Sequence, residues 1–329
     1  MNELAEFRAN ALKWLKKMST TLQPLSLIYN QQSGFHSTHH EGVYEELLHV
    51  LSQHGFEIQL FEMGEIGNFD QLMQQVLARH QAAHLSGVVV AAGGDGTLNA
   101  VAGKLIGTHI PMGILPLGTF NFVARVLNIP LDLIEAAQVI ATGTTRAVHV
   151  AQINQHIYLN NASLGLYPLF IKKRERYNQY LGRLPLHAYT SALDVLMRDR
   201  KELKLELEID TRRYPLKTPL IFFGNNQLQL SEMNLRIANA AAAGKVAGVA
   251  VAKSDKLTLF KILWQFIQGK AEQANDIYSF AAEQVVIHSE SPQLTVALDG
   301  EIVEMRPPLR ISVLKNALNI KVPHAAASV

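Results

Sequence analysis

Between residues 25 and 142 the chain alternates short apolar segments with longer segments of helical character, and this alternation limits the fold more than any other feature. Val88–Ala92, for example, is a β-branched, apolar run of the kind that forms a buried parallel strand. The alternation predicts a parallel sheet covered by helices on both faces, which is a three-layer α/β domain. The expected strands are Leu25–Tyr29, Phe56–Phe61, Val88–Ala92 and Met112–Leu115, and the expected helices are about 41–54, 69–83, 97–107, 119–128 and 131–142.

After Gly143 the pattern changes to that of an antiparallel β domain. Asn154-Gln155 separates two apolar segments, which is a hairpin signal, and Leu203–Ile209 alternates apolar and charged residues. Short strands of this kind predict an antiparallel β-sandwich. The remaining expected strands are 148–153, 156–160, 310–313 and 318–322, and helices are expected at about 185–199 and 255–269. The expected organisation is an N-terminal helix over 1–20, an α/β domain over 21–145 and a β-sandwich domain over 146–306.

Composition excludes several classes of protein. A chain of 329 residues is long enough for two domains of roughly 150 residues each. A formal net charge of +2 is not the footprint of a nucleic-acid-binding protein. The absence of cysteine excludes disulfides and thiolate metal sites and fits a reducing cytoplasm. No apolar run of 18 residues exists and the N-terminus lacks an apolar core, so neither a transmembrane helix nor a signal peptide is expected.

Residues 1–20 have the pattern of an amphipathic helix with basic residues and Trp14 off its apolar face. One interpretation is a helix that packs on its own domain or on the second chain of a homodimer. The other is an anchor at a membrane surface, for which a basic amphipathic helix with a tryptophan is suited. The apolar face consists of Leu4, Phe7, Ala11, Leu15 and Met18.

Gly93-Gly94-Asp95-Gly96 breaks the chain between the expected strand 88–92 and a helix for which Thr97 is a suitable N-cap. A glycine turn at a helix N-terminus presents free backbone N–H groups to a phosphate. Asp95 would repel a bare phosphate, so we expect it to bind a metal or a sugar hydroxyl, or to orient the attacking group. The alternative is a tight turn without a ligand. The Walker A pattern is absent, because neither Gly103-Lys104 nor Gly244-Lys245 has the rest of it. The dinucleotide fingerprint is absent because Asn99 occupies the place of its last glycine.

Four further motifs accompany Gly93–Thr97, and together the five cover about residues 25 to 325 in order. They are Asn30-Gln31-Gln32-Ser33-Gly34, Pro116-Leu117-Gly118-Thr119-Phe120-Asn121, Asn160-Asn161-Ala162-Ser163-Leu164-Gly165 and Leu298-Asp299-Gly300-Glu301. The Gly-Gly-Asp-Gly-Thr motif resembles the signature of the diacylglycerol kinase, sphingosine kinase and NAD kinase superfamily. With its neighbours, the chain is similar to the bacterial lipid kinases of the diacylglycerol kinase family.

The resemblance implies an NAD kinase-like ATP-binding domain, to which about residues 307–325 return, and a β-sandwich substrate domain. It implies transfer of the γ-phosphate of ATP, with Mg²⁺, to a hydroxyl of diacylglycerol or a related lipid at a membrane surface. The implied location is cytoplasmic, peripheral at the inner membrane surface. The alternatives are a sphingoid or other lipid kinase, a kinase of a soluble substrate like the NAD kinases, and a catalytically weak nucleotide- or lipid-binding regulator.

The resemblance also implies a role for individual residues. Glu301 is implied to be the general base for the lipid hydroxyl, with Asp299 beside it, and Asp95 to serve the catalytic Mg²⁺ and the phosphates. By itself Asp299-Gly300-Glu301 is equally an ordinary hairpin turn with a solvated glutamate. The implied nucleotide-binding residues are Asn30, Ser33, Gly34, Gly93, Gly94, Asp95, Gly96, Thr97, Asn99, Gly118, Thr119 and Asn121.

The chain departs from the family pattern at several positions. Gln31 replaces a proline, Ala100 a glutamate and Phe122 an aspartate that many members carry. Both acids of the family's structural Mg²⁺ segment are replaced by alanines in the matching stretch 243–247. We therefore expect that the structural Mg²⁺ site is absent and that Lys245 supplies part of its charge.

Overall fold

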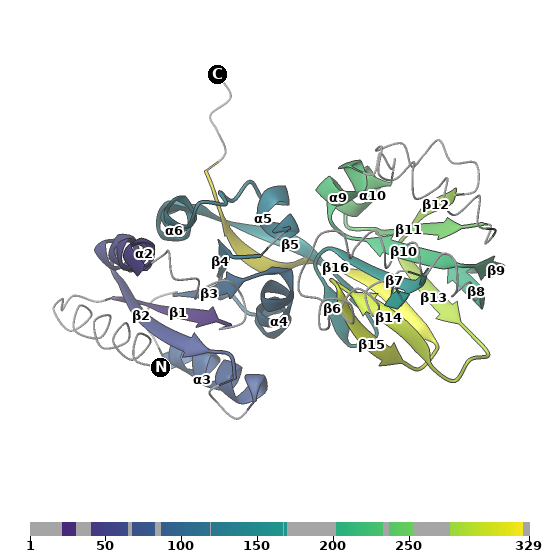
Figure 1. Cartoon of the computed structure of the whole chain (residues 1–329), viewed down its shortest axis with the longest axis horizontal. Helices are drawn as coiled ribbons and strands as arrows, with labels where there is room; N and C mark the ends of the chain where they lie inside the picture. Colours follow the sequence, from purple (N-terminus) through teal and green to yellow (C-terminus); the bar gives the residue numbers. More distant parts are fainter. Residues whose placement is uncertain are drawn as a thin grey trace, which may run out of the picture. The chain divides into compact units, whose positions relative to one another are not determined.

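Figure 1 shows the computed structural model of the chain, which forms two compact units. The first unit is Met1–Val148 with Asn316–Val329, and the second is His149–Lys315. The expected helices at 1–20 and 185–199 lie outside the described residues, as does the helix expected at 255–269 apart from residue 255. The described residues are 22–30, 41–64, 68–82, 87–118, 120–166, 168–169, 202–232, 237–252, 255 and 277–324.

The first unit is built on a parallel sheet with strand order β2-β1-β3-β4-β16. All residues of β3 are buried, as expected of a strand covered on both faces. The strands are β1 Gln23–Tyr29, β2 Phe56–Glu62, β3 Val88–Gly93, β4 Met112–Pro116 and the C-terminal part of β16 Leu309–Val322.

Helices cover both faces of this sheet, with α2 and α6 on one side and α3 and α4 on the other (Figure 1). The predicted three-layer α/β architecture is confirmed. The helices are α2 Glu41–Gln53, α3 Phe69–Ala82, α4 Asp95–Leu105, α5 Phe122–Val126 and α6 Leu133–Thr142.

Two predicted helix boundaries are wrong, and both errors concern the glycine loops. The helix after β3 begins at Asp95, and its N-cap is Gly94 in an extended conformation, whereas Thr97 was expected in that role. Thr97 is instead buried in the first turn. The helix expected at 119–128 is only Phe122–Val126, because Asn121 has a left-handed backbone with φ 51° and cannot continue a right-handed helix.

The second unit consists of antiparallel strands in two sheets, as predicted. One sheet has the order β12-β11-β10-β7-β14-β15, and the other contains β13, β8, β9, β5, β6 and the first part of β16. Buried side chains from both sheets, such as Leu164 and Ile287, form one apolar core. The strands are β5 Thr144–Ile153, β6 His156–Tyr158, β7 Asn161–Gly165, β8 Leu203–Ile209, β9 Arg212–Thr218, β10 Leu220–Gly224, β11 Val246–Val251, β12 Ile277–Ala282, β13 Gln284–His288, β14 Leu294–Leu298 and β15 Glu301–Met305, with helices α9 Gln227–Glu232 and α10 Ala238–Ala242.

The strands expected at 310–313 and 318–322 are one strand, β16, so the predicted break between them is wrong. Its first part pairs antiparallel with β13, and Ile320 pairs in parallel register with Met112 of β4. Asn316 lies between the two expected strands and takes a left-handed backbone with φ 53° while the strand continues. The division between the units falls in this strand at Asn316 and in β5 at Val148.

Within the residues that the structure describes, no helix is both long enough and apolar enough to cross a membrane.

Candidate functional site

The carboxyl ends of β1, β3 and β4 meet at one edge of the sheet of the first unit, because the three strands are adjacent and parallel. The register pairs Tyr29 with Ala92 and Gly93 with Pro116. Asn30 and the loops that begin at Gly93 and Leu117 therefore leave the sheet at the same level. Ligands of open α/β sheets bind at this edge.

The two glycine loops at this edge touch each other. A Cβ on Gly118 would lie 2.7 Å from the Cα of Gly94, and a Cβ on Gly94 would lie 3.3 Å from the Cα of Gly118. The backbone N–H of Leu117 also donates to the carbonyl of Gly93 at 3.1 Å. Glycine is therefore required at 118 by the close approach of two backbones, which places both loops in one cluster.

Asn121 holds the second loop in shape. Its Oδ1 accepts from the backbone N–H of Gly118 at 2.9 Å, and its Nδ2 donates to the carbonyl of the same residue at 2.8 Å. Asn121 is buried, and its left-handed conformation is one that asparagine tolerates better than most residues. The backbone N–H of Val123 then donates to Oδ1 of Asp95 at 3.4 Å, which connects α5 to the first turn of α4.

The arrangement suits a phosphate group. The N-cap Gly94 makes no side-chain hydrogen bond to the first turn of α4, and this helix end carries the positive end of the helix dipole. Gly96 and Asn99 lie in α4, and Asn99 is half-buried. Ser33, Gly34 and Thr119 lie outside the described residues. Hereafter the loop cluster means Asn30, Gly93–Thr97, Gly118 and Asn121.

In the second unit, the carboxylate of Asp299 accepts three backbone hydrogen bonds. Its Oδ2 accepts from Leu159 at 2.7 Å, and its Oδ1 accepts from Asn160 at 2.9 Å and from Asn161 at 2.8 Å. The N–H of Asp299 also donates to the carbonyl of Asn161 at 2.9 Å. Asp299 therefore ties the hairpin between β14 and β15 to the start of β7.

Asn225 and Asn226 complete this arrangement, and sequence reasoning missed them. The backbone N–H groups of both residues donate to the carbonyl of Asn160, at 2.8 and 3.2 Å. Nδ2 of Asn226 also donates to Oδ1 of Asn160 at 2.9 Å. Nδ2 of Asn225 donates to the carbonyl of Leu159 at 3.1 Å. The asparagine pair directly after an apolar strand was the available signal. Hereafter the asparagine cluster means Asn160, Asn161, Asn225, Asn226 and Asp299.

Glu301 is exposed and opens β15, directly opposite Leu298. It follows a two-residue turn in which Asp299 has φ 46° and Gly300 has φ 93°, the signs of a type I′ hairpin. Asp299-Gly300-Glu301 thus forms the hairpin turn that was one of its two interpretations from the sequence, and the backbone hydrogen bonds to Asp299 in the asparagine cluster fix this turn. Asp299 also acts electrostatically on buried Tyr158, whose pKa is raised first by burial and then by the negative charge of Asp299.

Lys245 lies in the stretch that the resemblance matches to a structural Mg²⁺ segment, and it faces a carboxylate. Its Nζ is 3.5 Å from Oε1 of Glu283, while Nζ of Lys315 is 3.0 Å from Oε2 of the same residue. The hydrogen bond from Lys315 and its positive charge are the main causes that lower the pKa of Glu283, and Lys245 adds to them. In the described part of the chain, no three His, Cys, Asp or Glu residues form a metal-binding group.

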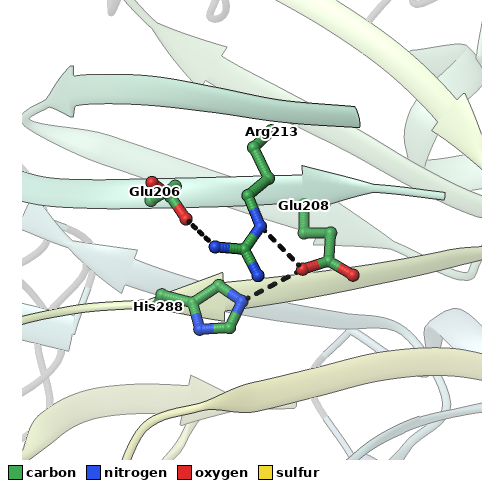
Figure 2. Close-up of polar contacts among 4 residues, drawn as sticks. All are labelled: Glu206, Glu208, Arg213 and His288. Carbon is green, nitrogen blue, oxygen red and sulfur yellow. Dashed lines mark hydrogen bonds and ion pairs between the residues drawn. The ribbon is translucent and has the colours of Figure 1, made fainter. Parts of the chain in front are cut away.

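A separate polar network lies on β8, β9 and β13 (Figure 2). Arg213 contacts Glu206 at 3.0 Å and Glu208 at 3.3 Å, and Nε2 of His288 is 3.4 Å from Glu208. Beside it is an open groove of about 640 Å³ lined mainly by residues of these strands, among them Lys204 and Lys217. The groove contains none of the predicted site residues. Exposed ion pairs of this kind contribute little to stability.

Comparison with known proteins identifies the first unit. The sequence model of the diacylglycerol kinase catalytic domain matches residues 24–153. In this part, the chain is similar to the diacylglycerol kinase family. The matched residues are thus similar to the catalytic domain of phosphotransferases with an alcohol acceptor.

Relatives and solved structures match a longer part of the chain. A diacylglycerol kinase of Staphylococcus aureus is 28% identical over 201 residues, covering 60% of this chain and 61% of that enzyme. An uncharacterized protein of Synechocystis sp. is 27% identical over 311 residues, covering 90% of this chain and 70% of that protein. The crystal structure of a diacylglycerol kinase from Bacillus anthracis has a TM-score of 0.68 at 20% identity and covers 92% of this chain and 98% of that chain. At that identity the similarity demonstrates a shared fold.

Proposed function

We propose that this chain is a member of the diacylglycerol kinase family and an ATP-dependent lipid kinase that phosphorylates a hydroxyl of diacylglycerol or a related lipid. The observation that carries the proposal is the loop cluster, in which two glycine loops meet at the end of a parallel sheet beside an uncapped helix N-terminus. Phosphoryl transfer depends mainly on positioning and on charge neutralisation, and backbone N–H groups at such an edge supply both.

The residues of the loop cluster fit both ATP and Mg²⁺. The uncapped first turn of α4 fits an anion, and the carboxylate of Asp95 in that turn is the kind of oxygen ligand that Mg²⁺ prefers. When bound, Mg²⁺ supplies neutralisation of phosphate charge. Within the loop cluster, Asp95 would hold the metal, Gly93–Thr97 would contact the phosphates, and Asn30, Gly118 and Asn121 would shape the site. Ser33, Gly34, Asn99 and Thr119 remain predicted nucleotide contacts.

Glu301 is proposed as the general base of the reaction. The lipid hydroxyl oxygen forms a bond to the γ-phosphorus, the bond to the bridging oxygen breaks, ADP leaves, and the hydroxyl proton passes to Glu301. Glu301 is exposed and follows a turn that the asparagine cluster holds, so its carboxylate is available on a fixed backbone. Asp299 is then proposed to position Glu301, since its own carboxylate accepts three backbone hydrogen bonds.

The substrate also determines where the protein is proposed to act. A diacyl lipid resides in a bilayer, so we propose that the enzyme works in the cytoplasm as a peripheral protein at the inner membrane surface. Attachment through residues 1–20, or use of these residues in a homodimer, remains a prediction from the sequence.

The test is transfer of radiolabelled γ-phosphate from ATP to lipids in mixed micelles, with diacylglycerol, sphingosine and a lipid without a free hydroxyl as acceptors. We expect label on diacylglycerol or sphingosine, dependence on Mg²⁺, and none on the lipid that lacks a hydroxyl. Nucleotide binding without transfer to any acceptor would contradict kinase activity and favour a regulator, an outcome that Ala100 and Phe122 make worth testing.

A further inference from the structure

Phe120 is an exposed aromatic residue within the second glycine loop. Its side chain is 54% exposed, and it is one of only four large apolar side chains that are exposed among the described residues. Its ring stacks on that of Phe122, with centroids 5.5 Å apart and planes inclined by 7°. About half of the apolar surface of this phenylalanine is therefore in contact with solvent and is available to a ligand.

The backbone around Phe120 is held in place. Asn121, the next residue, makes two hydrogen bonds to Gly118, and Phe122 begins α5. The ring of Phe122, at the start of α5, therefore supports the ring of Phe120. The side chain of Asn121 joins the residue after Phe120 to Gly118, which lies two residues before it. Phe120 thus presents an exposed aromatic ring that is supported by the ring of Phe122.

This surface lies beside the proposed phosphate site. Phe120 is two residues from Gly118, which corresponds to at most about 7 Å of backbone. Gly118 in turn packs against Gly94, the N-cap of α4. The ring is therefore within the reach of a base whose phosphates contact the first turn of α4.

We propose that Phe120, supported by Phe122, is the stacking platform for the base of the bound nucleotide. This inference rests on the proposed ATP-dependent function and concerns the base alone. Every nucleobase has a face that stacks on an aromatic ring. Phenylalanine has no hydrogen-bonding group, so the platform stabilises a base without reading its polar edge. The contribution of Phe120 to binding affinity should consequently be similar for ATP and GTP.

The experiment compares two ligands by isothermal titration calorimetry of the full-length protein with Mg²⁺. One ligand is ATP, and the other is inorganic tripolyphosphate, which carries the phosphates without a base. The variants are Phe120→Ala, Phe120→Trp, and Tyr278→Ala as a matched control, because Tyr278 is also an exposed aromatic residue, 61% exposed on β12. Binding to phosphatidylglycerol vesicles is measured in parallel.

We expect Phe120→Ala to weaken ATP binding by about 5- to 150-fold, the range of one base–aromatic stack. Tripolyphosphate binding should not change, Phe120→Trp should retain ATP affinity, and Tyr278→Ala should resemble the wild type. Equal weakening of both ligands would overturn the proposal and assign Phe120 to the shape of the loop. Loss of vesicle binding with unchanged ATP affinity would also overturn it and make Phe120 a membrane contact. A wild type that binds neither ligand would reject the proposed function together with the platform.

Discussion

At the scale of single residues, Gly118 is the position where one added methyl group should do most damage to the loop cluster. An alanine Cβ there would lie 2.7 Å from the backbone of Gly94 and 2.8 Å from Oδ1 of Asn121, so one loop must move. We expect Gly118→Ala to destabilise the protein by about 1–3 kcal/mol, as overpacking does, and to reduce ATP affinity. Chemical denaturation and ATP titration measure the two effects.

Two matched glycine variants serve as controls for Gly118→Ala. Gly94→Ala should have a smaller effect, because its Cβ would lie 3.3 Å from Gly118 and a shift of a few tenths of an ångström relieves the contact. Gly42→Ala, exposed in α2 with nothing within 4 Å, should stabilise by about 0.4–1 kcal/mol by restricting the unfolded chain. Wild-type stability and affinity in Gly118→Ala would show that the loops are not packed together as described.

Asp299 and Glu301, two residues apart, should give opposite results when each is changed to its amide. Asp299→Asn replaces a carboxylate that accepts three backbone N–H bonds with an amide that has one acceptor oxygen, and we expect a loss of about 2–4 kcal/mol of stability. Glu301→Gln should keep wild-type stability while turnover falls by about 10²- to 10⁴-fold. Thermal melts and kcat measurements separate the two.

A different outcome would exchange these roles. If Asp299→Asn melts like the wild type and still loses turnover, Asp299 acts in the chemistry itself. If Glu301→Gln turns over like the wild type, Glu301 is not the base.

The sequence indicates candidate residues better than it indicates how they are held. Gly94, Gly118 and Glu301 are recognisable because a glycine run after a strand and an Asp-Gly turn are local patterns. The contact between Gly94 and Gly118 depends on the order of the strands in the sheet. The hydrogen bonds of Asn225 and Asn226 reach Asn160, which lies more than 60 residues earlier in the chain. Side-chain hydrogen bonds over such separations leave no local pattern, so their partners could not be predicted.

At the scale of elements, the contact between α3 and β1 contains a buried histidine that should make stability depend on pH. Nε2 of His80 lies 3.0 Å from Oγ of buried Ser26. Burial lowers the pKa of His80 to about 4, and the positive charge of Arg79 contributes. His80 lies in the last turn of its helix, where the helix dipole favours a positive charge, and burial outweighs that effect.

The pKa of His80 in the folded protein is below its unfolded value of about 6.5. Below pH 6.5 the unfolded chain therefore binds a proton that the folded chain does not, and stability falls as the pH decreases toward 4. The loss from this residue approaches about 3 kcal/mol at pH 4. Urea unfolding between pH 7 and 4.5 should show a smaller decline for His80→Gln than for the wild type. Equal declines would mean that His80 titrates normally.

Element types were predictable where composition and burial agree, and boundaries were not. Val88–Ala92 reads as a buried strand because every residue in it is apolar, and all of β3 is buried. The start of α4 was misplaced because Thr97 is the better N-cap by propensity, whereas the N-cap is Gly94, which packs against the backbone of Gly118. Tertiary packing thus overruled the local preference.

At the scale of the whole molecule, β16 belongs to both units, and its two halves should stabilise different parts of the protein. Ile311 is fully buried in the core of the second unit, and Ile320 is fully buried beside Met112 in the sheet of the first. Alternating apolar residues predicted strands near both positions, and only the resemblance implied that about residues 307–325 return to the first domain. The two isoleucines therefore form a matched pair within one strand.

Ile320→Ala and Ile311→Ala remove the same atoms, so each should cost about 2–5 kcal/mol in its own unit. We expect Ile320→Ala to increase hydrogen exchange of backbone amides in β1, β3 and β4 while those of β7, β10 and β14 keep wild-type protection. Ile311→Ala should produce the reverse pattern. Because both variants leave the chain intact, a difference in their hydrogen-exchange patterns shows which unit each half of β16 stabilises. If both variants accelerate exchange equally in all six strands, the two units unfold as one cooperative body, and the division at Asn316 carries no energetic meaning.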